Sequence, residues 1–281
     1  MVAFKHLIPA LLILWAAPVI HADGTPVQLP EVTYAPNDDT FHQEQYQDLF
    51  VKTELSLKSA ARTVLESEIF SKGLGLNSNF QFKYPIRVEI KEIPEESLYH
   101  GLQGTAGLRQ IDGQWVHVLT LNIGAYVQNP EEDVNQLLSH EMAHMVLADF
   151  MGAQESAEVP MWLNEGMAQS VTHEGHSRVN DFARSLGWEE SMIIPCELDS
   201  PVDTFAHGEG NYACYPEYYL AVQRLKRTGG PLAIGKILRD LRDGKKTADA
   251  FFAATRTDYS LFQQDVNAYT ADVIAGRKPI P

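Results

Sequence analysis

The chain has 281 residues, of which 44% are hydrophobic and 21% are charged, a composition typical of a globular protein with a sizeable core. Its formal net charge of -15 offers no electrostatic basis for binding phosphate backbones, which argues against nucleic acid as a partner.

The first 22 residues differ in character from the rest. Lys5 precedes an apolar run from Leu7 to Ile20, which is too short to span a bilayer comfortably. The run ends in His-Ala-Asp, with a plausible cleavage position after Ala22. This layout predicts a signal peptide at residues 1–22 and an exported chain, periplasmic or secreted, with no membrane span after cleavage. An uncleaved membrane anchor is the alternative.

Two segments precede the first strand. Residues 23–39 are rich in Pro, Asp and Gly, which predicts an extended leader with little structure. From Thr40 to about Lys72, apolar residues recur at steps of three and four, and Gly73 follows as a stop. This spacing predicts a helix.

The period then changes to two. In YPIRVEIKEI, Ile and Val alternate with charged residues, which predicts a half-buried strand. Asp112-Gly113 is a hairpin signal between two further predicted strands, 105–111 and 114–123. A small antiparallel or mixed sheet should therefore precede the next helix.

The next helix has a well-marked start. Asn129 is a good N-cap, Pro130 suits the first helical position, and Glu132 lies three residues after the cap. We expect the helix to run from 130 to about 150 and to end before Gly152.

The remainder reads as mainly helical. A second helix is expected to start near Pro160, and residues 175–211 are expected to be irregular. Four more helices are predicted, at 213–228, 231–243, 246–254 and 260–274.

The stretch HEMAH places His140 and His144 four residues apart, so a helix presents both imidazoles on one face. Zinc accepts imidazole nitrogen, and a catalytic zinc site has three protein ligands and an open position. Glu141 follows His140, where a carboxylate can accept a proton from water. The alternative is that these are ordinary helix residues. Because unpaired polar groups are costly among apolar neighbours, a metal site is the better interpretation.

A third ligand has to come from elsewhere in the chain. The metzincin continuation requires Gly and His where this chain has Leu147 and Phe150, so that class is excluded. The stretch WLNEG offers Glu165 on the next helix, 21 residues after His144. Three other residues stay open as alternatives: Glu155, Glu158 and His173.

HEMAH followed by PMWLNEGMAQS resembles the gluzincins of the peptidase MA clan, in particular the aminopeptidase branch and its shorter relatives. A weaker resemblance extends over roughly residues 85–275. It implies one zinc ion held by His140, His144 and Glu165, with Glu141 as the general base. It also implies a peptide or protein substrate.

The resemblance further implies an α+β, zincin-like fold, with a small mixed or antiparallel sheet and the HExxH helix followed by a mainly helical C-terminal lobe. Together with the character of the N-terminal segments, it gives the expected divisions: a signal peptide 1–22, a leader 23–39, one catalytic domain 40–275 with lobes 40–152 and 153–275, and a tail 276–281.

Several further residues are candidates around the site. The resemblance to the gluzincins implies a Tyr or His that stabilises the oxyanion, and it favours Tyr215 for this role. Its neighbours Tyr212, Tyr218 and Tyr219 are alternatives, and each of the four can instead be a packing residue. Asp149 or Glu174 could orient a ligand imidazole. The resemblance gives Asn164 and Gln169 at most an outer supporting role, and we expect His117 to pack in a strand and His173 and His176 to lie at the surface.

The two cysteines, Cys196 and Cys214, both belong to the exported part. An even number of cysteines in an oxidising compartment predicts one disulfide, which would contribute about 3 kcal/mol in the chain-entropy model.

The sequence as a whole predicts a zinc-dependent hydrolase, a peptidase that uses Glu141 to activate water. The chain has no GAMEN-type stretch to bind a free substrate amine, which favours an endopeptidase or a specialised hydrolase. The alternative is a non-catalytic, zinc-containing binding protein with a peptidase-like fold.

Overall fold

The computed structural model describes residues 27–36, 43–93, 104–128, 133–172, 174–185, 198 and 214–281. The predicted signal peptide, 1–22, lies outside these residues. The first half contains the elements β1 (Val32–Tyr34), α1 (Gln43–Glu66), a π-helical turn (Ile69–Gly73), β2 (Ile86–Lys91), β3 (Gly104–Ile111), β4 (Gln114–Asn122) and α2 (Ile123–Gln128). The second half contains α3 (Val134–Met151), a 3₁₀ turn (Glu155–Glu158), α4 (Met161–Thr172), α5 (Glu174–Ser185), α6 (Tyr215–Arg242), α7 (Thr247–Thr255) and α8 (Tyr259–Ile274).

The strands form one mixed sheet in the order β1-β2-β4-β3. β2 pairs in parallel with both β1 and β4, whereas β3 pairs antiparallel to β4 and forms the end of the sheet. Between β3 and β4, Asp112 and Gly113 both have positive φ, as a two-residue hairpin turn requires. The predicted strands and hairpin are confirmed.

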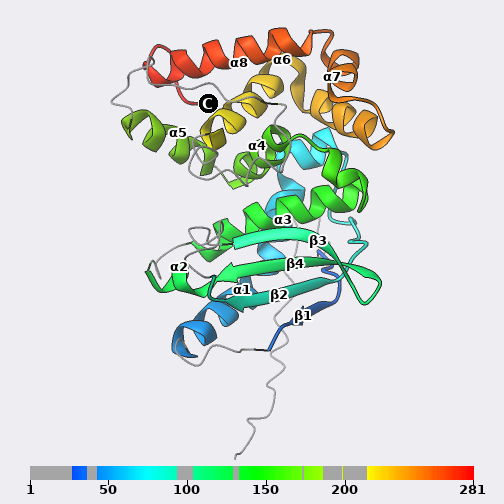
Figure 1. The fold of residues 1–281 in the computed structure, drawn as a ribbon, viewed down its shortest axis with the longest axis vertical. Helices are drawn as coiled ribbons and strands as arrows, with labels where there is room; N and C mark the ends of the chain where they lie inside the picture. The colour runs from blue at the N-terminus through cyan, green and yellow to red at the C-terminus, as the bar shows by residue number, and fades with distance from the viewer. Residues whose placement is uncertain are drawn as a thin grey trace, which may run out of the picture.

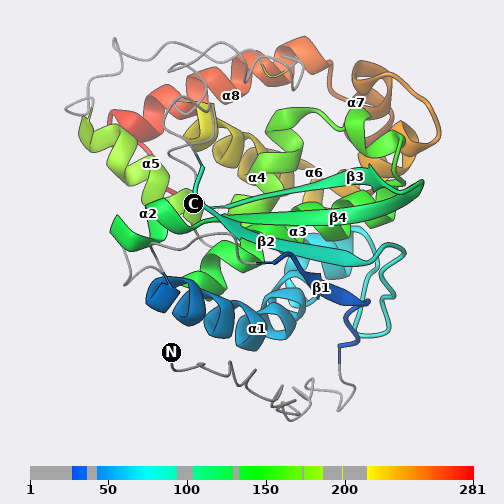
Figure 2. The ribbon, with the colours of Figure 1, turned by 60° about the horizontal axis from the view of Figure 1, so that its bottom comes forward.

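Helices α1 and α3 cover one face of the sheet (Figure 1 and Figure 2). Alternation in β2 turns Ile86, Val88 and Ile90 inward, and all three are buried. On that face the Tyr34 ring lies 4.6 Å from the Phe50 ring of α1. A Cβ on Gly104 of β3 would lie 3.2 Å from a methyl carbon of Leu137 in α3. Helix α3 is thereby fixed against the sheet.

Helices α4 to α8 lie on the far side of α3 from the sheet, whereas α2 lies at the end of the sheet (Figure 1). One cluster of buried apolar side chains runs through both halves, and Leu57, Leu138, Trp162 and Val222 of α1, α3, α4 and α6 belong to it. The structure is therefore mixed α+β and zincin-like, as the sequence predicts. Among the residues described, no helix is both long and apolar enough to cross a bilayer.

The structure adds one detail to the predictions for the first 151 residues and corrects another. The segment 23–39, predicted to be extended with little structure, contains the short strand β1 (Val32–Tyr34), which pairs with β2. Helix α3 begins at Val134, where the Asp133 side chain accepts hydrogen bonds from the backbone N–H groups of two following residues. The expected cap, Asn129, lies outside the described residues.

In the C-terminal half, part of the stretch expected to be irregular is helical. Helix α5 occupies Glu174–Ser185, and its Val179 and Ala183, one turn apart, are fully buried. The predicted break between two helices near residue 230 is confirmed, because Gly230 has φ 70° and ψ 170° inside α6. Only glycine adopts that conformation readily.

Candidate metal centre

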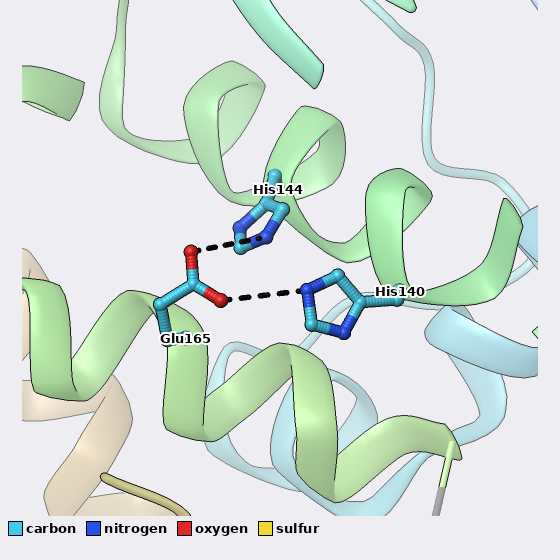
Figure 3. A group of neighbouring side chains, drawn as sticks. All are labelled: His140, His144 and Glu165. Carbon is cyan, nitrogen blue, oxygen red and sulfur yellow. Dashed lines mark ion pairs between the residues drawn. The ribbon is translucent and has the colours of Figure 1, made fainter. Parts of the chain in front are cut away.

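Two helices bring three potential ligands together (Figure 3). His140 and His144 lie one turn apart on α3, and Glu165 comes from α4. Their ligand atoms all lie within 4.8 Å of one another. The Glu165 carboxylate lies between the rings, with Oε2 3.4 Å from His140 Nε2 and Oε1 3.6 Å from His144 Nε2.

The position of Glu165 is set by close backbone packing. Gly152, with φ 108°, ends α3, and the chain returns as α4. Gly166, next to Glu165, faces α6, where a Cβ would lie only 2.3 Å from the carbonyl oxygen of Tyr218. A larger residue at Gly166 would therefore move α4 and its carboxylate away from the imidazoles.

Each imidazole is held through its Nδ1 atom by an oxygen acceptor. Nδ1 of His140 lies 3.0 Å from Oε2 of Glu174, and Nδ1 of His144 lies 2.8 Å from Oδ1 of Asn164. Because a carboxylate and an amide oxygen accept hydrogen bonds, Nδ1 is the donor in both rings. The Nε2 atoms then face Glu165 with their lone pairs available for a metal ion.

The residues of this group fit a divalent cation. In their neutral form both Nε2 atoms, like the Glu165 carboxylate, are electron-pair donors, so a proton or a metal ion is needed between them. Oε2 of Glu165 is buried and has no hydrogen-bond partner in the described part of the chain. Two imidazole nitrogens and one carboxylate oxygen form a donor set typical of catalytic zinc.

The charges around the group shift two of its pKa values. Burial by itself lowers the pKa of His140, but Glu165 and Glu174 outweigh burial and raise that pKa to about 10. Burial by itself raises the pKa of Glu165, but His144 and His140 outweigh it and bring that pKa below its usual value. Glu165 is therefore an anion at neutral pH, as a metal ligand must be.

Glu141 has a different environment from Glu165. It is buried, with 5% of its surface exposed, and burial raises the pKa of its carboxyl group. The nearby charges of His140 and His144 act in the opposite direction without cancelling the effect. A carboxylate with a raised pKa beside a potential metal site is suited to accepting a proton.

The candidate tyrosines occupy different places on α6. The Tyr215 ring lies under the Arg178 guanidinium at 5.4 Å. The pKa of Tyr218 is raised to about 12 by burial, then by the charge of Glu217 and that of Glu165. The Tyr219 hydroxyl donates a hydrogen bond of 2.6 Å to the carbonyl oxygen of Pro281. Tyr212 lies outside the described residues.

The expected role of Asp149 was wrong. Its carboxylate lies 3.1 Å from Nε2 of His117 and accepts from the backbone N–H of Lys83, also at 3.1 Å. His117 and Asp149 are fully buried, and the pair joins β4 to the end of α3. His117 is therefore hydrogen-bonded as well as packed. Of Asp149 and Glu174, only Glu174 lies within hydrogen-bond distance of His140 or His144 in the described structure.

The other candidate residues also differ in whether they contact the ligand group. Asn164 contacts His144, whereas Gln169 is fully buried and its side chain has no hydrogen-bond partner among the described residues. Glu155 and Glu158 are not part of the metal-binding group found in the described chain, and His176 is exposed on α5. His173 and Cys196 lie outside the described part of the chain. The role of His173 and the pairing of Cys196 with Cys214 therefore stay predictions.

A small mixed sheet, a histidine-bearing helix packed on it and a carboxylate from the following helix define a zincin-like protein. A model of the peptidase MA superfamily matches residues 118–271, more than half of the chain. The chain therefore belongs to the peptidase MA superfamily, which indicates a peptidase. The matched region runs from β4 into α8 and includes the three ligand candidates. No curated protein was found that matches the chain.

The contacts of Asp149 predict that a substitution at this position affects the stability of the protein but not its metal binding. Asp149→Asn should lower the free energy of unfolding by about 1–3 kcal/mol, because it weakens one buried and one partly buried hydrogen bond. Metal binding by the folded protein should not change, because Asp149 contacts none of the three ligand candidates. Denaturant unfolding and metal analysis of the native fraction measure the two effects. Loss of zinc from folded Asp149→Asn would contradict this assignment.

Proposed function

We propose that the protein is an exported zinc-dependent peptidase of the gluzincin type. The observation that carries the proposal is the convergence of His140, His144 and Glu165 within 4.8 Å, with buried Glu141 beside them. Zinc held by the three side chains would lower the pKa of a water molecule to about 7 and polarise a peptide carbonyl.

Glu141 carries out the proton transfers. Its carboxylate accepts a proton from the attacking water, and the raised pKa makes it a better acceptor than an exposed glutamate. The protonated carboxyl then delivers that proton to the nitrogen of the departing amine. Glu165 stays anionic, because the neighbouring histidines lower its pKa.

The edge of the sheet is suited to binding an extended peptide substrate. Strand β4 lies between β2 and β3, whereas β3 has an outer edge in the described sheet. An extended peptide can add to such an edge through its backbone hydrogen-bonding groups. Helix α3 packs against β3 at Gly104, so this strand lies next to the helix that carries His140 and His144.

Tyr218 is our preferred hydroxyl for steadying the developing oxyanion. The charge of Glu165 contributes to the raised pKa of Tyr218, so this phenol lies within electrostatic range of the ligand group and stays protonated at neutral pH. Tyr215, the residue favoured from the sequence, interacts with Arg178 instead.

A glutamine at position 141 tests the mechanism. Glu141→Gln should retain one zinc per chain and lose peptide hydrolysis, because the amide cannot accept the proton from water. Metal analysis and a digest of an unbiased peptide library provide the measurements. Turnover at the wild-type rate would refute the role of Glu141. A wild-type chain that holds zinc and cleaves nothing would instead be a non-catalytic binding protein.

Removal of Glu165 tests the third ligand. Glu165→Ala should weaken zinc binding more than about 100-fold, beyond the loss typical for a residue that only supports a ligand. The matched control is Glu158→Ala, which removes an exposed carboxylate that lies outside the ligand group. Competition with a chromophoric chelator measures both affinities. Equal retention in the two variants would exclude Glu165 as a ligand.

Two phenylalanine variants distinguish the tyrosines. Tyr218→Phe should lower kcat by about 100- to 1,000-fold, the loss typical for one oxyanion donor, and leave KM nearly unchanged. Tyr215→Phe should stay within a few-fold of wild type in both constants. Steady-state kinetics on one library-derived peptide measures both, and the reverse pattern would return the role to Tyr215.

A further inference from the structure

Glu174 bridges the candidate ligand His140 and a cation. Oε2 of its carboxylate lies 3.0 Å from Nδ1 of His140. Oε1 accepts from Nε of Arg178 at 2.5 Å and also pairs with Nη2 of that side chain. Each oxygen therefore has its own partner, and the carboxylate is fixed from both sides.

Helix α5, which carries Glu174, is seated closely on α6. A Cβ on Gly175 would lie only 2.1 Å from Cδ2 of the Tyr219 ring, so glycine allows the first turn to touch α6. Arg178 lies over the Tyr215 ring at 5.4 Å, and Val179 is buried in a cluster with Tyr219 and residues of α8. Packing along two turns holds the carboxylate in place.

The two imidazoles have unequal partners. Glu174 offers His140 a carboxylate, whereas Asn164 offers His144 a neutral amide oxygen. A hydrogen bond to an anion is the stronger of the two and increases the electron density on the opposite ring nitrogen. The side chain of Gln169, one turn after Glu165 on α4, is buried and makes no hydrogen bond to the described residues, so it does not replace Glu174.

We propose that Glu174 is the positioning residue of His140, and that Arg178 and the seating of α5 on α6 hold it in that role. Glu174 fixes the Nδ1–H tautomer and the ring orientation, and strengthens Nε2 as a metal ligand. The proposal rests on the proposed zinc site and adds to it an unequal pair of histidines, with His140 the stronger donor.

Zinc affinity of the full chain tests this proposal. Glu174→Ala should bind zinc about 10- to 100-fold more weakly than wild type, the range for residues that orient a metal ligand. Glu174→Gln should lose affinity less, because its amide oxygen still accepts from Nδ1 but carries no charge. The matched control is Arg184→Gln, which removes an exposed ion pair with Asp181 on the same helix and should leave affinity within twofold.

Two further measurements separate positioning from a merely structural role. Thermal melting of the metal-free variants reports on folding, and a structural role would lower the melting temperature while leaving zinc affinity unchanged. The visible spectrum of the cobalt-substituted protein reports on ligand geometry, and it should change in Glu174→Ala but not in Arg184→Gln. Because Glu174→Gln is nearly isosteric, it keeps the test valid if the alanine variant does not fold.

The outcomes distinguish this proposal from the proposed function. A wild-type chain that binds zinc and cleaves peptides, with Glu174→Ala and Glu174→Gln unchanged in affinity and cobalt spectrum, overturns the positioning role alone. A wild-type chain that binds no zinc overturns both proposals. An equal loss of affinity in Arg184→Gln would show that any disturbance of α5 suffices, and would also overturn the specific role of Glu174.

Discussion

The site depends on three electron-pair donors that face one another, an arrangement that requires a cation or a proton between them. The Nδ1 atoms of His140 and His144 are occupied by Glu174 and Asn164, which leaves both Nε2 atoms facing the carboxylate of Glu165 at 3.4 and 3.6 Å. Unpaired polar groups in a buried place are costly, so the apolar helix α3 would not tolerate this arrangement without a positive partner. The high pKa of His140 has the same origin, because a proton on that ring relieves the excess of negative charge.

The carboxylates reach the histidines because two glycines allow helices to approach closely. Gly166 follows Glu165 and touches the backbone of α6, and Gly175 follows Glu174 and touches the Tyr219 ring. Each carboxylate thus starts from a backbone held against α6, so little side-chain freedom remains. Helix α6 acts as a common support for both, while α3 is held from the other side by the sheet and α1. The geometry of the site is therefore a consequence of packing between helices far apart in sequence.

The spacing of residues in the sequence predicted those features that depend only on the geometry of a few neighbouring residues. The period-two run in β2, the Asp112-Gly113 turn and the four-residue separation of the histidines depend on a few neighbouring residues, and all are found as predicted. The contact between Glu174 and His140 spans 34 residues and depends on how α5 packs, which spacing cannot fix. Asp149 could have been excluded. It lies nine residues after His140, about 180° around a helix with about 3.6 residues per turn, and so faces the sheet.

Two carboxylates of one site have opposite properties because their surroundings differ. Glu165 lies between the two imidazoles, and their charge lowers its pKa despite burial. Glu141 is equally deep, but burial dominates there and raises its pKa. Groups whose pKa values are pushed apart in this way can divide the work of a reaction, one staying charged while the other exchanges a proton. The same division explains the order of residues in HEMAH, since a glutamate directly after the first histidine shares its burial without lying between the rings. Electrostatics thus supports the proposed roles of Glu165 as ligand and Glu141 as base, in addition to the resemblance to a family.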